Sequence, residues 1–278
     1  MFTHTKYWGL REAPFPSRAD AQHCFISASH REALARLTYL VEDSRRLGLL
    51  LGARGTGKSH ALEAFARELR DRRCQVARVS LTATDPRQLL SDLATGLHIE
   101  LPPHAGRYEQ WRALEDRLIE HRYQRLATVL LLDDAGRATS EVVDQVLRLI
   151  DLDPGSGAQL SIVAATTPEG ASRLGPELLD RVYLRADLEP WDEAEVGQFV
   201  ETALAAAGAR RAVFTAAAIE RLYEATAGVA RRVAQFAELA LVAAAGEGLT
   251  EIGPETIDSV ARELGVAAWG ESAALARS

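Results

Sequence analysis

The sequence predicts an α/β protein with a parallel sheet, followed by a small all-helical domain. Five short apolar runs bounded by polar or turn residues are typical of strands that are covered on both faces of a parallel sheet. They span residues 47–51, 75–81, 128–133, 160–165 and 181–188. Helical patterns lie between them, at residues 60–72, 86–96, 108–124 and 140–150. This alternation of strand and helix predicts a doubly wound fold with five parallel strands flanked by helices.

The pattern changes after Pro190, where strands give way to alanine-rich helical segments. These segments span residues 192–207, 215–227, 230–245 and 254–264. Thr215 is placed for an N-cap and Pro254 for a first helical turn. We therefore predict three parts: an α/β domain over residues 1–190 that includes an N-terminal segment 1–46, a helical domain over 191–268, and a flexible tail over 269–278.

Composition limits the class of protein and its surroundings. The 278 residues are 47% apolar and 26% charged, which is typical of a soluble globular protein. The net charge of −7 provides no global positive field for nucleic acid or anionic lipid, although local arginine clusters would still attract phosphate. Cys24 and Cys74 are the only cysteines, which favours a reducing compartment. No apolar run approaches 18 residues, so we expect no transmembrane segment and a cytoplasmic protein.

A glycine-rich stretch, "GARGTGKS", joins the first predicted strand to a helix at residues 52–59. It matches the P-loop (Walker A) pattern G-x-x-x-x-G-K-[ST], in which backbone N–H groups and the helix N-terminus surround phosphate oxygens. The alternative is a glycine-rich turn before an ordinary helix. We expect the phosphates of ATP or ADP to contact Gly52, Gly55, Thr56, Gly57, Lys58, Ser59 and His60.

The lysine of this stretch is chemically selective. Lys6 and Lys58 are the only lysines among 32 lysine and arginine residues, so an unconstrained basic position would be expected to carry arginine. A compact ammonium reaches the β- and γ-phosphates of a nucleotide, whereas a broad guanidinium fits such a loop poorly. Lys58 is therefore predicted to be a phosphate ligand, and the Ser59 hydroxyl a ligand of Mg²⁺.

Two carboxylates end the third predicted strand, in "ATVLLLDDAG". In P-loop enzymes the first such carboxylate (Walker B) helps to hold Mg²⁺ and the next residue often polarises the attacking water. We assign these roles to Asp133 and Asp134; the alternative is a pair of solvated acids at a strand end. Because Asp134 is one methylene shorter than the usual glutamate, hydrolysis would be slow or the water would be placed differently.

Hydroxyl side chains follow two other strands near this site. Thr166 and Thr167, in "VAATTPEG", would either hydrogen-bond the γ-phosphate or its water, or simply satisfy the loop. Ser80 ends the second strand and is a candidate partner for the Asp134 carboxylate.

Several segments together resemble the AAA+ ATPases, and among them the ExeA-type (general secretion pathway protein A) ATPases. They are "YWGLREAPF", "SHREALARLTYLVE", "LLLDDAG" and "AGVARRVAQFAELAL", within a similarity that covers about residues 6–265. The resemblance implies the P-loop AAA+ fold with a helical lid. It departs from the family in "DDAG", where members usually carry "DEAQ".

The resemblance also implies roles for residues outside the P-loop. Ile26, with Phe25 and His30, would form the adenine side of the pocket. Arg181 matches an arginine finger that reaches a neighbouring subunit; the alternative is a surface arginine or an ion pair within the subunit. Arg231, with Arg232 beside it, matches a lid arginine that contacts the γ-phosphate.

These observations predict an AAA+ ATPase that hydrolyses ATP with Mg²⁺ at subunit interfaces of a ring or filament. Its cycle would drive assembly or remodelling of a protein partner in machinery of the secretion or pilus type. Two alternatives stay open: an ATP-dependent DNA-associated regulator such as a transposition helper ATPase, and a nucleotide-gated scaffold with little turnover.

Overall fold

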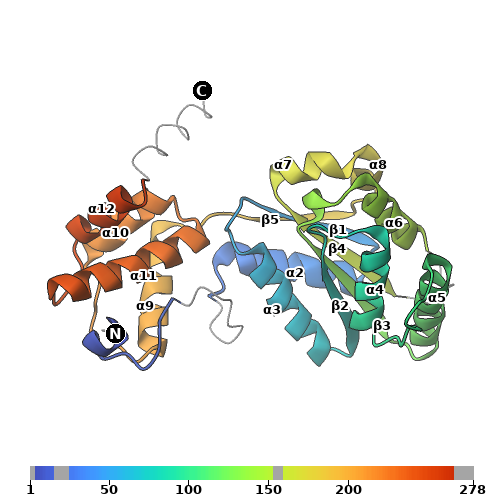
Figure 1. Ribbon diagram of the computed structural model, residues 1–278, viewed down its shortest axis with the longest axis horizontal. Coiled ribbons are helices and arrows are strands. Elements are labelled where there is room, and N and C mark those ends of the chain that lie inside the picture. Colours follow the sequence, from blue (N-terminus) through green and yellow to red (C-terminus); the bar gives the residue numbers. More distant parts are fainter. Residues whose placement is uncertain (1–3, 16–24, 153–158, 266–278) are drawn as a thin grey trace. The chain divides into compact units, whose positions relative to one another are not determined.

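The computed structural model describes residues 4–15, 25–152 and 159–265 (Figure 1). These residues form two compact units. One spans residues 28–189, and the other combines residues 190–265 with the described N-terminal residues up to Ser27. The predicted tail at 269–278 lies outside the described residues.

The unit over residues 28–189 contains a five-stranded parallel sheet with the order β2-β3-β4-β1-β5. The strands are β1 (Leu47–Gly52), β2 (Cys74–Ser80), β3 (Ala127–Asp133), β4 (Leu160–Thr166) and β5 (Leu184–Leu188). Each predicted strand is present. The last one begins at Leu184 instead of residue 181, because Arg181 and Val182 close a turn by donating to the carbonyls of Leu178 and Leu179.

Helices cover both faces of this sheet, as Figure 1 shows. One face packs against α2 (Ala28–Glu42) and α3 (Lys58–Asp71). The other packs against α4 (Pro86–Gly96), α5 (Arg107–Tyr123) and α6 (Ser140–Asp151). Successive strand side chains point to opposite faces, so Leu49 and Leu51 enter one core and Leu50 the other. Burial on both faces explains why the strands are continuously apolar, and the predicted doubly wound fold is confirmed.

The other unit is built from the four helices that the alanine-rich segments predict. They are α9 (Glu193–Ala206), α10 (Ala216–Thr226), α11 (Ala230–Glu247) and α12 (Pro254–Glu263). The Thr215 hydroxyl accepts a hydrogen bond from the amide of Ala218, and Pro254 occupies the first position of α12. Both predicted helix starts are therefore confirmed.

Residues 4–15, the first described part of the predicted N-terminal segment, pack with these helices and not with the sheet. After the short helix α1 (His4–Tyr7), Trp8, Leu10 and Phe15 are buried in the core of the helical unit. The indole Nε1 of Trp8 donates to the carbonyl of Leu241 at 2.9 Å. The assignment of residues 4–15 to the α/β domain is therefore wrong, because their large apolar side chains are buried among the helices. Residues 28–46 of the same predicted segment lie in the α/β unit as expected, with α2 packed on the sheet.

Two short helices, α7 (Pro168–Ala171) and α8 (Pro176–Leu179), connect β4 to β5. No helix among the described residues combines the length and the apolar character that a membrane span requires.

Candidate functional site

The P-loop lies where β1 ends at Gly52 and α3 begins at Lys58. Gly55 and Gly57 have φ angles of 89° and 104°, which a residue with a side chain rarely adopts. Space is also limiting at Gly57, because a Cβ there would lie 2.7 Å from Nε2 of the buried His30. The glycines therefore allow the sharp loop that the motif requires, and His30 packs against the P-loop.

Lys58 is held inside this loop. Its Nζ donates to the carbonyl oxygens of Gly52 and Ala53 at 2.8 and 2.9 Å, and the residue is only 8% exposed. The hydroxyl of the buried Thr56 also donates to Ala53, at 3.0 Å. The ammonium is thus already oriented at the end of the strand, while Ser59 lies exposed beside it. His60 is likewise exposed on the first turn of α3.

The carboxylate of Asp133 is buried at the carboxyl end of β3 and accepts two hydrogen bonds. Its Oδ1 accepts from the backbone N–H of Asp134 at 3.0 Å, and its Oδ2 accepts from Arg78 at 2.9 Å. The guanidinium of Arg78 also pairs with Glu63 at 3.0 Å. The arginine was not singled out in the sequence, although a charged residue in the strand "CQVARVS" is a visible signal.

Asp134 adopts the left-handed backbone conformation, with φ 54° and ψ 36°, which aspartate tolerates better than most residues. Its Oδ2 accepts a hydrogen bond from the Thr82 hydroxyl at 3.2 Å. Thr82, not Ser80, is therefore the partner of this carboxylate. The Ser80 hydroxyl instead accepts from the backbone N–H of Thr82 at 3.4 Å.

The donor groups at this edge of the sheet fit Mg²⁺. The exposed Ser59 hydroxyl and the Asp133 carboxylate are hard oxygen donors, and Mg²⁺ is commonly held by one or two carboxylates together with substrate phosphates. No group of three or more His, Cys, Asp or Glu side chains among the described residues forms a cage for a metal. The arrangement therefore suits a metal that arrives with a nucleotide. One oxygen of Asp133 is already paired with the Arg78 guanidinium.

The threonines after β4 satisfy local backbone groups. The buried Thr166 hydroxyl accepts from the backbone N–H of Gly136 at 3.1 Å. The Thr167 hydroxyl caps α7 by accepting from the N–H of Gly170 at 3.0 Å. Both hydroxyls therefore have the alternative role, which is to hydrogen-bond backbone groups of the loop. A sensing role for Thr167 remains a prediction.

Glu169, in the first turn of α7, is a charged residue that the sequence analysis did not single out. A hydrogen bond to its own backbone amide, another to Thr167, and the charge of Lys58 lower the pKa of its carboxyl. The interaction with Lys58 places an exposed carboxylate within electrostatic reach of the P-loop. "TTPEG" contains this acid, but a glutamate after a proline gives no signal of its own.

Arg181 is engaged within its own chain. It pairs with Asp151 at the end of α6 and, at 3.5 Å, with Glu177 of α8. The ion-pair alternative is therefore present in this structure. Reach toward a neighbouring subunit remains a prediction.

Two predicted site residues lie in the helical unit. Arg231 is exposed in the first turn of α11 and Ile26 is half-buried. Phe25, expected on the adenine side, packs its ring against Trp191 and Phe199, with centroids 5.1 and 5.9 Å away. Part of the predicted adenine segment therefore contributes to the core of the helical unit.

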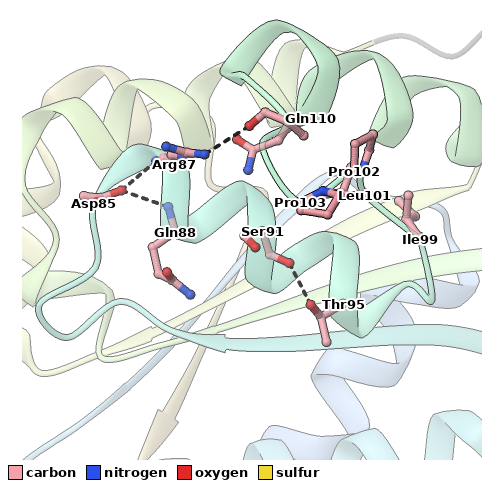
Figure 2. Close-up of a pocket in the computed structure, with 11 residues that line it drawn as sticks. Asp85, Arg87, Gln88, Ser91, Thr95, Ile99, Leu101, Pro102, Pro103 and Gln110 are labelled. Carbon is pink, nitrogen blue, oxygen red and sulfur yellow. Dashed lines mark hydrogen bonds between the residues drawn. The ribbon is translucent and has the colours of Figure 1, made fainter.

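A separate polar groove lies between α4 and the loop that leads into α5 (Figure 2). Asp85 caps α4 there, and Arg87 donates to the carbonyl of Ala105. These residues follow β2, and none of them belongs to the P-loop or to the carboxylate pair.

The sequence matches the AAA domain family over residues 41–174. It is 26% identical over 265 residues to general secretion pathway protein A of Aeromonas hydrophila, a region that covers 94% of this chain and 48% of that protein. The chain therefore spans about half the length of this relative.

Solved structures share the fold at low sequence identity. The ORC1 protein of Aeropyrum pernix in complex with DNA has a TM-score of 0.69 at 17% identity, over 95% of this chain and 71% of that one. Drosophila ORC bound to DNA gives 0.66 at 18% identity, over 94% and 65%. The RuvB Holliday junction branch migration motor of Thermotoga maritima gives 0.60 at 16% identity, over 91% and 74%. The chain therefore has the P-loop AAA+ fold, is similar to the AAA domain family over residues 41–174, and resembles the ExeA-type AAA+ ATPases.

Proposed function

We propose that this chain binds ATP together with Mg²⁺ and hydrolyses it. The observation that carries the proposal is the P-loop, in which Lys58 is buried and oriented at the start of α3 beside two glycines with positive φ. Backbone N–H groups, a helix N-terminus and a fixed ammonium together favour a polyphosphate ligand.

In this proposal each polar group at the carboxyl edge of the sheet has one task. Ser59 and Asp133 hold Mg²⁺, and Asp134 orients the attacking water. Thr167 and Arg231 respond to the γ-phosphate. Cations placed in advance stabilise the charge that spreads over the transferred phosphoryl group.

The proposal extends to a ring or filament in which Arg181 completes the site of a neighbouring subunit. The nucleotide cycle would tighten and loosen contacts between subunits and so assemble or remodel a protein partner in the cytoplasm. The similarity to general secretion pathway protein A supports machinery of the secretion or pilus type.

Steady-state ATP turnover, measured across protein concentration with and without Mg²⁺, tests this function. We expect specific activity that needs Mg²⁺, rises with protein concentration, and disappears in Lys58→Ala. Binding of ATP that is equally strong in the Lys58→Ala variant would overturn the proposal.

A second candidate is a DNA-associated ATPase, favoured by the folds of ORC1 and ORC, which were solved with DNA. Retention of double-stranded DNA that requires ATP and weakens steeply with salt would support it. The absence of such retention at low salt would exclude it.

A third candidate is a nucleotide-gated scaffold, favoured by the short Asp134 side chain and its hydrogen bond to Thr82. Here Asp134→Glu would raise a near-zero turnover strongly, because the carboxylate would extend one methylene further. Efficient turnover by the unmodified chain would remove this candidate.

A further inference from the structure

One arginine joins the helix of the P-loop to the strand that carries the proposed metal ligand. Nη2 of Arg78 lies 2.9 Å from Oδ2 of Asp133, and Nη1 lies 3.0 Å from Oε2 of Glu63. The side chain of Asp133 is only 8% exposed, whereas those of Arg78 and Glu63 are 32% and 34% exposed. The guanidinium therefore has one buried partner and one partner near solvent.

The strand register explains this position. β2 and β3 run parallel, with Arg78 opposite Leu131 and Ser80 opposite Asp133. The neighbours of Arg78 along β2, Ala77 and Val79, are buried in the core against α4, so Arg78 projects from the other face. That face is covered by α3, which carries Glu63.

The bridge changes the charge of the metal site. Oδ1 of Asp133 already accepts a hydrogen bond from the N–H of Asp134, and Oδ2 already accepts one from the positively charged guanidinium of Arg78. A fixed positive charge at this distance opposes the approach of a second cation to the same carboxylate. Glu63 pairs with the other terminal nitrogen, Nη1, and so offers the guanidinium a second partner.

We propose that Arg78 is the resident counter-ion of Asp133, and that the competition between them sets the affinity of the site for Mg²⁺. Glu63 retains the guanidinium when it leaves the carboxylate. Arg78 is thus a positioning residue. With its charge beside Asp133, nucleotide binding depends less on Mg²⁺ than it would if this carboxylate were unpaired. This inference rests on the proposed binding of ATP with Mg²⁺.

The test measures the free Mg²⁺ concentration that half-saturates the complex of the chain with a fluorescent, non-hydrolysable ATP analogue. In Arg78→Met we expect this concentration to fall about tenfold or more, because an opposing unit charge is removed next to the ligand. Arg78→Lys keeps the charge and should stay within about threefold of the unmodified chain. Affinity for the analogue in EDTA should fall in Arg78→Met and persist in Arg78→Lys.

Glu63→Gln provides a variant that leaves both groups of the competing pair intact. It should raise the half-saturating Mg²⁺ concentration severalfold, and this effect should shrink when Arg78→Met is present. An unchanged half-saturating concentration in both Arg78→Met and Glu63→Gln would overturn the inference while leaving ATP binding intact. Analogue binding that Lys58→Ala does not weaken would instead overturn the proposed function, and the inference with it.

Discussion

Gly136 and Gly170 approach each other so closely that a Cβ on Gly136 would lie 2.5 Å from the Cα of Gly170. The same Cβ would lie 2.4 Å from the hydroxyl oxygen of Thr166. The glycine of "DDAG" therefore lets the start of α7 pack directly on the turn that follows Asp133 and Asp134. The family's "DEAQ" carries a longer side chain at this position, which the present packing has no room for.

Gly136→Ala is expected to destabilise the unit over residues 28–189, because backbone atoms and not a flexible side chain must move. Overpacking of this kind typically costs about 1–3 kcal/mol. The free energy of unfolding in urea measures the change. Gly246→Ala is the control, since a Cβ there meets nothing within 4 Å and α11 gains a better helix former. Equal stability of both variants would contradict the close approach.

Lys58→Arg is expected to weaken ATP binding by about a hundredfold or more, although the charge is conserved, because the enclosed site fits a point charge and not a planar fork. Isothermal titration with ATP measures this affinity. Lys6→Arg is the matched control, since Lys6 is the other lysine of the sequence and is exposed on α1. Retention of full affinity in Lys58→Arg would show that charge alone suffices.

If Arg181 acts on a neighbouring subunit, Arg181→Ala should lower kcat on the order of 10³-fold while ATP affinity changes little. Asp151→Asn removes one of its present partners and should keep or increase turnover by releasing the guanidinium. Arg36→Ala, at an exposed arginine paired with Glu32, is the control. Unchanged turnover in Arg181→Ala would contradict a role in a neighbouring site and leave only the ion pairs within the chain as the role of this arginine.

His121 is expected to make stability depend on pH. Burial, followed by the charge of Arg117, lowers its pKa below the ordinary 6.5, against an opposing effect of Glu120. The unfolded chain then binds the proton more tightly than the folded one. The stabilisation is therefore complete above about pH 6.5 and is lost as the pH falls below that value.

Unfolding free energies between roughly pH 7.5 and 5.5 test this linkage. We expect His121→Asn to show a shallower pH dependence than the unmodified chain. A lower stability of this variant above pH 6.5 would reflect the lost contact of Nδ1 with the Thr128 hydroxyl, which measures 2.8 Å. Parallel curves of unfolding free energy against pH for the two proteins would contradict a lowered pKa of His121.

Hydrophobic periodicity predicted the sheet and the larger helices well, because burial on both faces leaves long apolar runs. Residues 128–133 and 160–165 differ from β3 and β4 by one residue at most. The turns of α7 and α8 and the short α1 were not predicted, since four-residue helices carry no period. Residues 4–15 were assigned to the wrong unit, because a sequence shows that Trp8 is apolar but not which core buries it.

At the site, the motif residues were predictable and their neighbours were not. Fixed spacing along the chain is enough to predict Lys58, Ser59 and Asp133 as site residues. Arg78 and Thr82 reach Asp133 and Asp134 from the neighbouring strand β2 and the loop after it, a placement that single-residue chemistry does not encode. Thr166 and Thr167 show the opposite case. Their hydroxyls are plausible partners of the γ-phosphate from the sequence, but in the structure they accept hydrogen bonds from backbone N–H groups.

The hydrogen bond from Trp8 to Leu241 has a consequence for synthesis on the ribosome. The helical unit is discontinuous in sequence. Its first core residues therefore leave the ribosome long before the helices that bury them. The whole unit over residues 28–189 can fold in that interval, while Trp8, Leu10 and Phe15 stay exposed. Closing so long a loop is slow, and exposed aromatic surface invites association in the meantime. We therefore expect folding during synthesis to begin with the unit over residues 28–189 and to end when residues 4–15 pack against α11 and its neighbours.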